Sequence, residues 1–361
     1  MGYVLICTEA SQFAGKARAA LRWKGVDFSE TVATPEVYRD IIEPRIGFRI
    51  VPILLTDDGR AIQDSADIID FADVAASGPS IHPPTSVQDF VSLLLGLYAD
   101  EWLVIPAMHY RWDYGAEWIV EELGRTARPD APRAEQIQIG QVIAAPIREE
   151  VPRFGVSDDT ISGIQAHYEG FLADFSSHLR KLPFVLGSRP SLGDFAIFGA
   201  LYGPLYRDPV LGEQMRRLAP PVIEWVERMR SAGGGGGDLL PNDDIPATLL
   251  PLLKRQMAEQ APVLADTARA FQEWTRSQPG GARVKRSLGA HEFVIGGRRG
   301  ERSIRSFVLW RLQRIQDRYK ALMEPDRWRI DSLLDAVGGS ELVHQPMPVR
   351  LDRRDYRLVI A

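Results

Sequence analysis

The stretch Val51-Pro52-Ile53-Leu54-Leu55-Thr56-Asp57-Asp58-Gly59-Arg60-Ala61-Ile62-Gln63-Asp64-Ser65 decides the fold of the first part of this chain. Its apolar start predicts a buried strand, Asp57-Asp58-Gly59 predicts a tight turn, and the next three residues predict a returning strand. Asp64 and Ser65 then offer side-chain oxygens that cap the start of a helix. We therefore predict a β-hairpin followed directly by a helix.

The residues before this hairpin alternate between strand and helix signals. The apolar run 3–7 predicts a buried strand, and residues 14–24, rich in Ala, Leu, Lys and Arg, predict a helix. Gly25 is a typical helix stop, and residues 26–32 predict a second strand. The order βαβ and then ββα indicates a small α/β unit with a mixed sheet.

The remainder of the chain changes character twice. Ser, Gly and Pro at 77–84 predict a linker, and residues 87–229 show helical periodicity with almost no strand signal. The five glycines 233–237 predict a second linker or a mobile loop. Beyond it we predict one or two helices over 246–278, and the later elements are a hairpin over 291–305 with its turn at 296–300, a helix over 306–323 and a strand over 356–360.

The composition excludes several classes of protein. The chain has 361 residues, of which 45% are hydrophobic, so it is long enough for two or three domains with a real core. Its single cysteine, Cys7, excludes an internal disulfide framework, and no Cys/His cluster has zinc-ligand spacing, so we expect no metal. No run of 18 apolar residues and no signal-peptide pattern is present, and we expect a cytoplasmic protein without a membrane span.

The net charge of −5 hides an asymmetry along the chain. Residues 1–77 hold 8 Lys+Arg against 12 Asp+Glu, residues 78–282 hold 18 against 26, and residues 283–361 hold 17 against 10. The basic last part could bind nucleic acid or an anionic surface. Because its basic residues are interleaved with an amphipathic pattern, we favour the alternative that it docks on the acidic body of its own chain.

Four segments together resemble the glutathione transferase superfamily. They are Ser11 to Arg18 at the first helix start, the dipeptide Val51-Pro52, the pair Asp64-Ser65, and Phe184 to Phe195 with its capping box Ser191-x-x-Asp194. Each motif is weak alone, but their order and spacing are specific. The resemblance implies a thioredoxin-like α/β domain (1–77) and an all-helical C-terminal domain (86–231). Residues 232–361 would form an α+β extension of unknown role.

The resemblance implies that Ser11 is the catalytic residue. Its hydroxyl, at a helix N-terminus with partial positive charge, would stabilise the thiolate of glutathione, the expected co-substrate. The alternative is that Ser11 is an ordinary helix cap. Thr8 is a rival hydroxyl donor. Cys7 lies inside the apolar run, which favours a buried structural thiol over one that forms a mixed disulfide.

The same resemblance implies how glutathione itself would bind. Val51, before a Pro52 that could be cis, would pair through its backbone, and Asp64 and Ser65 would hold the γ-glutamyl end. Arg49 would face the glycine carboxylate, the alternative being a solvated loop arginine.

A small hydrophobic electrophile is the expected second substrate. Tyr98, Trp102, His109 and Trp112 fall on one helical face, and with Phe13 they are candidates for its pocket. The alternative is that the rings form core between domains.

Two functions follow from these observations. The first is a transferase that conjugates glutathione to an electrophile through Ser11. The alternative is a non-catalytic glutathione-binding or protein-binding module that uses the transferase fold, with the extension as its functional surface. The resemblance also implies a homodimer. We do not expect nucleic-acid binding, because no aromatic residues are clustered among the arginines as a stacking platform requires.

Overall fold

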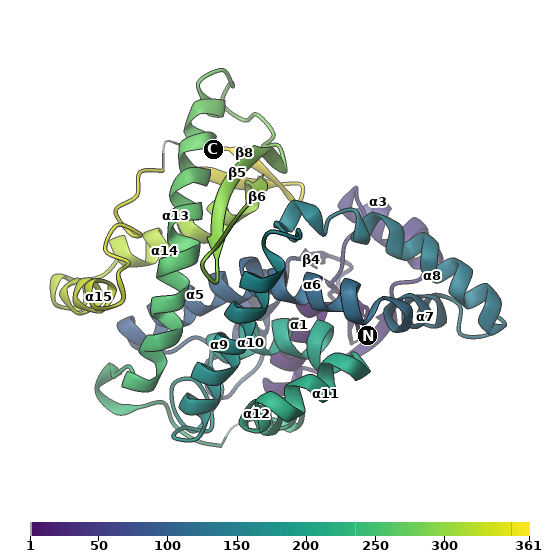
Figure 1. Cartoon of the computed structure of the whole chain (residues 1–361), viewed down its shortest axis with the longest axis horizontal. Helices are drawn as coiled ribbons and strands as arrows, with labels where there is room; N and C mark the ends of the chain where they lie inside the picture. Colours follow the sequence, from purple (N-terminus) through teal and green to yellow (C-terminus); the bar gives the residue numbers. More distant parts are fainter. Residues whose placement is uncertain (1, 235, 348) are drawn as a thin grey trace.

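The computed structural model of the chain describes residues 2–234, 236–347 and 349–361. A small mixed sheet with its helices is followed by a large helical part and by an extension that contains two hairpins (Figure 1). In Figure 1 the long helix α13 of the extension runs beside the hairpin β5–β6, and the pair α7 and α8 projects on the opposite side of the view. The predicted fold class, an α/β domain followed by an all-helical domain and an α+β extension, is confirmed.

The N-terminal part is a four-stranded sheet of order β2-β1-β3-β4. Strand β1 pairs in parallel with β2, whereas the pairs β1–β3 and β3–β4 are antiparallel, as the βαβ-ββα pattern predicts. The elements are β1 (Tyr3–Cys7), α1 (Gln12–Trp23), β2 (Phe28–Val32), α2 (Pro35–Val37), η1 (Tyr38–Ile42), α3 (Glu43–Ile46), β3 (Ile53–Leu55), β4 (Ala61–Gln63) and α4 (Ser65–Ala75).

The alternation of side chains along β1 builds a core on both faces of this sheet. Leu5 packs with apolar residues of α1 and α4 on one face. Ile6, its neighbour in the chain, packs with Ile42 and Ile46 on the other. The loops that follow β1 and β4 therefore start at fixed places, and both carry residues of the predicted site.

The second part consists of helices. They are α5 (Ser86–Glu101), α6 (Val104–Tyr114), α7 (Ala116–Ala127), α8 (Arg133–Arg148), η2 (Pro152–Phe154), α9 (Ile161–Leu179), α10 (Leu192–Leu201), η3 (Tyr202–Tyr206), α11 (Pro209–Leu218) and α12 (Pro220–Ser231). Ser191 and Asp194 form the predicted capping box at the start of α10, and Asp194 is fully buried.

The first long helix breaks earlier than the sequence predicts. Pro106, inside an otherwise helical stretch, predicts a break at that residue. In the structure α5 ends at Glu101 and α6 begins at Val104, so Pro106 lies in the first turn of α6. A proline is tolerated there because the backbone N–H that it lacks would have no helical partner. By length and composition alone, residues 86–114 could cross a membrane, because an 18-residue stretch within them has a mean hydropathy of 1.5. However, 89% of that 18-residue stretch is buried inside the protein.

The extension contains the remaining elements. They are η4 (Pro241–Asp243), η5 (Ala247–Leu249), α13 (Leu250–Thr275), β5 (Ser287–Ile295), β6 (Arg298–Arg305), α14 (Phe307–Lys320), α15 (Glu324–Val337), β7 (Leu351–Arg354) and β8 (Arg357–Ile360). The turn of the first hairpin is shorter than predicted. Only Gly296 and Gly297 form it, both with positive φ, because a two-residue turn of this kind matches the twist of the strands.

Polar contacts fix the extension to the helical part. Gln256 and Gln260 of α13 donate to the backbone carbonyls of Leu94 and Leu97 in α5, over 2.8 and 3.2 Å. Both glutamines are buried, so losing either bond would leave a polar group unpaired in the core. Arginines of α14 also pair with acidic residues of α4 and α5. The prediction that the basic part docks on the acidic body of its own chain is confirmed.

Candidate functional site

The first hydroxyl of the predicted site, that of Ser11, caps helix α1. Its Oγ accepts a hydrogen bond from Ala14 N at 3.3 Å, and its side chain is half-buried. An oxygen that accepts from the backbone leaves its own O–H free to donate elsewhere. Thr8, the rival donor, lies in the same loop and is also half-buried, and its carbonyl accepts from Ser11 N at 3.2 Å.

Residues of the helical part hold this loop in place. Arg111 of α6 donates to the carbonyl of Ala10 at 2.8 Å and to that of Gly203 at 2.7 Å, while Asp208 accepts from the same guanidinium. Gly203 in η3 approaches so closely that a Cβ there would lie 3.1 Å from Gln12 N. Arg111 lies between His109 and Trp112, two of the predicted pocket residues. Nothing in the sequence around it indicates that this arginine reaches the Ser11 loop.

Cys7 is a buried structural thiol in this arrangement. Its Sγ donates to Glu30 Oε2 at 3.3 Å and accepts from Arg18 Nη2 at 3.1 Å. Burial raises the pKa of the Cys7 thiol to about 12, although the nearby Arg18 guanidinium lowers it. A thiol that stays protonated at neutral pH is a poor nucleophile, which favours the structural interpretation.

The peptide bond between Val51 and Pro52 is cis, immediately before β3. Val51 is half-buried. Arg49, two residues earlier, is exposed, forms an ion pair with Glu43 and lies 5.9 Å from the centre of the Tyr38 ring. Its guanidinium is therefore already matched by a carboxylate of its own loop.

Asp64 and Ser65 lie where β4 ends and α4 begins. Asp64 has a positive φ of 85°, and its Oδ1 accepts from Ala66 N at 2.8 Å. Ser65 is 1% exposed, and its Oγ has no hydrogen-bond partner within the part of the chain that the structure describes. Burial would raise the pKa of Asp64, but Arg311 and the Ala66 N–H lower it more, so the carboxylate stays ionised.

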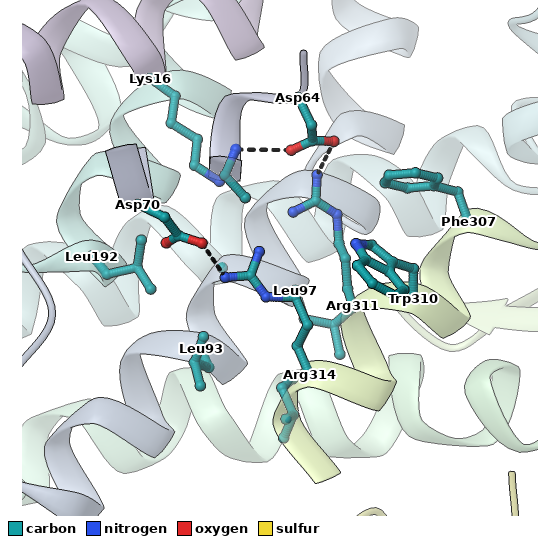
Figure 2. A pocket seen from close by; sticks show the side chains of 13 residues that line it. Lys16, Asp64, Asp70, Leu93, Leu97, Leu192, Phe307, Trp310, Arg311 and Arg314 are labelled. Carbon is teal, nitrogen blue, oxygen red and sulfur yellow. Dashed lines mark hydrogen bonds and ion pairs between the residues drawn. The ribbon is translucent and has the colours of Figure 1, made fainter. Parts of the chain in front are cut away.

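The extension reaches this end of the site through Arg311 of α14. Its guanidinium lies 2.7 Å from Asp100, 3.4 Å from Glu101 and 3.6 Å from Asp64. Figure 2 shows Arg311 beside Asp64. On the next helical turn Arg314 pairs with Asp70 of α4 at 2.6 Å. The sequence shows the positive charge of this segment but not the carboxylates that each arginine meets.

A small cavity remains between these groups (Figure 2). Lys16 and Asp64 line it from the N-terminal part, Leu97 from α5, and Trp310 and Arg311 from α14. Its volume is about 40 Å³, whereas small-molecule pockets usually measure roughly 300–1,000 Å³. In this arrangement the cavity is too small for a tripeptide.

The aromatic residues predicted to bind the second substrate are core residues here. Tyr98, Trp102, His109 and Trp112 are each at most 3% exposed, which favours the core interpretation. Phe13, on α1, is half-buried.

Trp102 contacts a group that sequence reasoning missed, and Tyr98 is linked to the same group through His167. Glu259 of α13 accepts from Trp102 Nε1 at 3.0 Å and contacts His167 Nδ1 at 2.5 Å. The other nitrogen of His167 lies 3.1 Å from the hydroxyl of Tyr98. The aromatic face thus anchors the extension.

Two family models match the chain. The N-terminal domain of glutathione S-transferase matches residues 5–80, and the C-terminal domain of glutathione S-transferase matches residues 148–228. These two matched ranges belong to the glutathione transferase superfamily. The matched ranges contain the Ser11 loop, the cis Val51–Pro52 peptide, the Asp64–Ser65 turn and the Ser191–Asp194 capping box, and they end before the extension. No curated protein matches the chain significantly.

Several solved structures resemble this one. A beta-etherase from Sphingobium sp. strain SYK-6 is 19% identical, covers 64% of this chain and 96% of its own, and superposes with a TM-score of 0.48. A glutathione S-transferase from Methylobacterium radiotolerans, in complex with glutathione sulfonate, is 20% identical over 63% of this chain and 90% of its own, with a TM-score of 0.42. A Tau class glutathione S-transferase from mango, Mangifera indica, is 18% identical, covers 63% of this chain and 88% of its own, and superposes with a TM-score of 0.39.

Proposed function

We propose that this protein is a cytoplasmic glutathione transferase that joins glutathione to a small hydrophobic electrophile. The observation that carries the proposal is the half-buried Ser11 hydroxyl at the N-terminus of α1. Its oxygen accepts from Ala14 N, and its O–H donates to no group among the residues that the structure describes. The homodimer that the family resemblance implies belongs to the same proposal, as do the domain boundaries 1–77, 86–231 and 232–361.

The chemistry requires a thiolate at neutral pH. A free thiol has a pKa of about 8.5, and lowering that pKa by about two requires about 2.7 kcal/mol of differential stabilisation. A hydrogen bond from Ser11 to the sulfur and the partial positive charge of the α1 N-terminus supply stabilisation of this order. The thiol proton leaves to solvent, the sulfur lone pair forms the new bond to carbon, and a displaced group departs with its electron pair.

The remaining residues would position glutathione around this centre. The backbone of Val51 would pair with the cysteinyl main chain, with the cis Pro52 fixing the local geometry, and Ser65 would hold the γ-glutamyl carboxylate. Asp64, kept ionised, would accept from the α-amino group. Arg49 would turn from Glu43 toward the glycine carboxylate, and Phe13 would contact the electrophile.

A non-catalytic module is the second candidate, and one observation favours it. The Asp64 carboxylate is already matched by Arg311 of the extension, and the cavity beside it is small. A protein that kept the fold but lost glutathione would have this arrangement. The extension would then be the functional surface.

Calorimetric titration of reduced glutathione into the wild-type protein and the Ser65→Ala variant separates a protein that binds glutathione from a protein-binding module that has lost it. Saturable binding that weakens about 10- to 100-fold in the variant supports the site, because a hydrogen bond to a charged group contributes about 1.5–3 kcal/mol. Ser29→Ala, an exposed serine in β2 at the opposite edge of the sheet, is the control and should leave the affinity unchanged. The absence of binding at millimolar glutathione would refute the transferase proposal and leave the module.

A further inference from the structure

The second hairpin of the extension, β7–β8, lies against the strip of the N-terminal part that would bind glutathione. Arg353 donates to the backbone carbonyl of Gln63 at 3.1 Å and to the Gln63 side-chain oxygen at 2.5 Å, and it pairs with Asp67 of α4. Gln63 directly precedes Asp64. The guanidinium thus contacts the Gln63 carbonyl before the Asp64–Ser65 turn and the Asp67 carboxylate after it.

The tip of this hairpin covers the loop before the cis peptide as well. The hydroxyl of Tyr356 donates to Ala61 O at 3.1 Å, and its ring packs with a cluster that includes Val51. Arg357 donates to Gly47 O at 2.8 Å, and its guanidinium lies 4.5 Å from the centre of the Phe48 ring. The contacts of the tip therefore run from the loop at residue 47 to helix α4.

The backbone of the tip is strained. Asp355 and Tyr356 have φ values of 48° and 61°, in the left-handed region that glycine and asparagine normally supply at such a turn. For a bulky residue such as tyrosine this conformation is unfavourable, and it persists only where the surroundings hold it. The contact between Tyr356 and Ala61 supplies such a hold.

The base of the hairpin is fixed elsewhere, within the extension. The backbone N–H of Leu351 donates to the Gln313 side chain of α14 at 2.8 Å, and the Gln313 amide donates back to the Leu351 carbonyl. Val284 N donates to Leu358 O at 2.9 Å. The contacts that hold the base are therefore separate from those that hold the tip.

We propose that the segment Arg353–Arg357 is a latch that keeps glutathione out of its site until the tip lifts. The inference rests on the proposed function, since it needs glutathione to bind at Val51, Asp64 and Ser65. Arg353 acts as an internal cation that meets the same acidic strip as the α-amino group of the ligand. The apparent dissociation constant of glutathione equals its intrinsic value divided by the open fraction, so weakening the latch tightens binding.

The test is calorimetric titration of glutathione into three full-length variants. The Arg353→Ala/Arg357→Ala double variant removes both guanidinium contacts, and Tyr356→Gly removes the ring while relieving the positive φ. Arg354→Ala is the matched control, because Arg354 lies in the same strand, is exposed, and pairs with Asp352 of its own hairpin. Thermal unfolding checks that every variant folds, and hydrogen exchange reports whether the tip is released.

The latch predicts that the double variant and Tyr356→Gly bind glutathione about tenfold more tightly than wild type, with Arg354→Ala unchanged. Equal affinity in all four proteins, with the tip shown to be released, would overturn the latch and leave the proposed function standing. If no protein binds glutathione although the tip is released, the proposed function fails, and the latch fails with it because it has no ligand to exclude.

Discussion

The two ends of the proposed glutathione site differ in what surrounds them. At the sulfur end, the Ser11 loop is held by Arg111 of α6 and by Gly203 of η3, and its hydroxyls stay half-buried. At the γ-glutamyl end, Asp64 faces Arg311 of the extension, and the hairpin tip lies on the residue before it.

The residues that would activate the thiol therefore differ from those that would control how glutathione enters the site. The part of the site that would activate the thiol is built by residues that precede the extension, and the family models end at residue 228. The part that would recognise the tripeptide is covered by residues beyond that point. We infer that the extension acts on this protein through binding of glutathione, while the reacting centre is left as the two domains make it.

The largest expected effect concerns the anchor of the extension. Glu259→Ala leaves the buried nitrogens of Trp102 and His167 without their acceptor, so we expect the free energy of unfolding to fall by about 3 to 5 kcal/mol. Urea denaturation measures the change. Glu273→Ala, an exposed position on the same helix, is the control and should cost almost nothing. A loss below about 1 kcal/mol for Glu259→Ala would show that the extension is held in another way.

The stability of the protein should also depend on pH, through His82 near the γ-glutamyl end of the site. Burial alone would lower the pKa of His82, but hydrogen bonds with Asp70 and Asp89 raise it to about 9 from the ordinary 6.5. A raised folded-state pKa stabilises the protein fully below pH 6.5, and that stabilisation is lost as the pH rises through 9. The total is about 3 kcal/mol.

Urea denaturation of wild type and His82→Gln at pH 6 and pH 9.5 checks this expectation. The variant should be less stable than wild type at pH 6, and the difference should nearly disappear at pH 9.5. A difference that is the same at both pH values would mean that His82 does not carry the charge assigned to it.

At the sulfur end, two hydroxyls compete for the same role. We expect Ser11→Ala to lower kcat/KM toward a panel of small aromatic electrophiles by about 10- to 100-fold, because a hydrogen bond to a thiolate is lost. Thr8→Ala is the matched comparison and should change kcat/KM by less than about threefold. A larger loss of kcat/KM in Thr8→Ala than in Ser11→Ala would show that Thr8, not Ser11, donates to the thiolate.

The smallest expected effect is that of Cys7→Ala. The thiol is buried and its pKa is raised to about 12 by that burial, so we expect it to take no part in turnover. Steady-state kcat/KM should stay within about twofold of wild type. A tenfold loss would instead point to mixed-disulfide chemistry at the end of β1.

Local signals predict some parts of this site and miss others. The helix start at Asp64 and Ser65 is predicted because their side-chain oxygens can cap a helix and because a hairpin signal comes directly before them. Both signals lie within about ten residues of the sequence. The face shared by Tyr98 and Trp102 is also visible in the sequence, but its partner Glu259 lies 157 residues after Trp102. No local pattern says whether an aromatic face meets a ligand or a helix of the same chain.

The charge of the last segment shows the same limit. An excess of seven positive charges over residues 283–361 predicts docking on an acidic body. Which carboxylates Arg311 and Arg353 meet depends on how α14 and the second hairpin pack. The position of the latch over Gln63 therefore emerges only in three dimensions.

The most direct test of the central claim is a crystal structure of the protein with reduced glutathione bound. The account predicts the γ-glutamyl group at Asp64 and Ser65, the sulfur near Ser11, and the hairpin tip lifted, with Arg353 no longer bonded to Gln63. Glutathione bound at another place, or bound at this strip with Tyr356 still donating to Ala61, would contradict it.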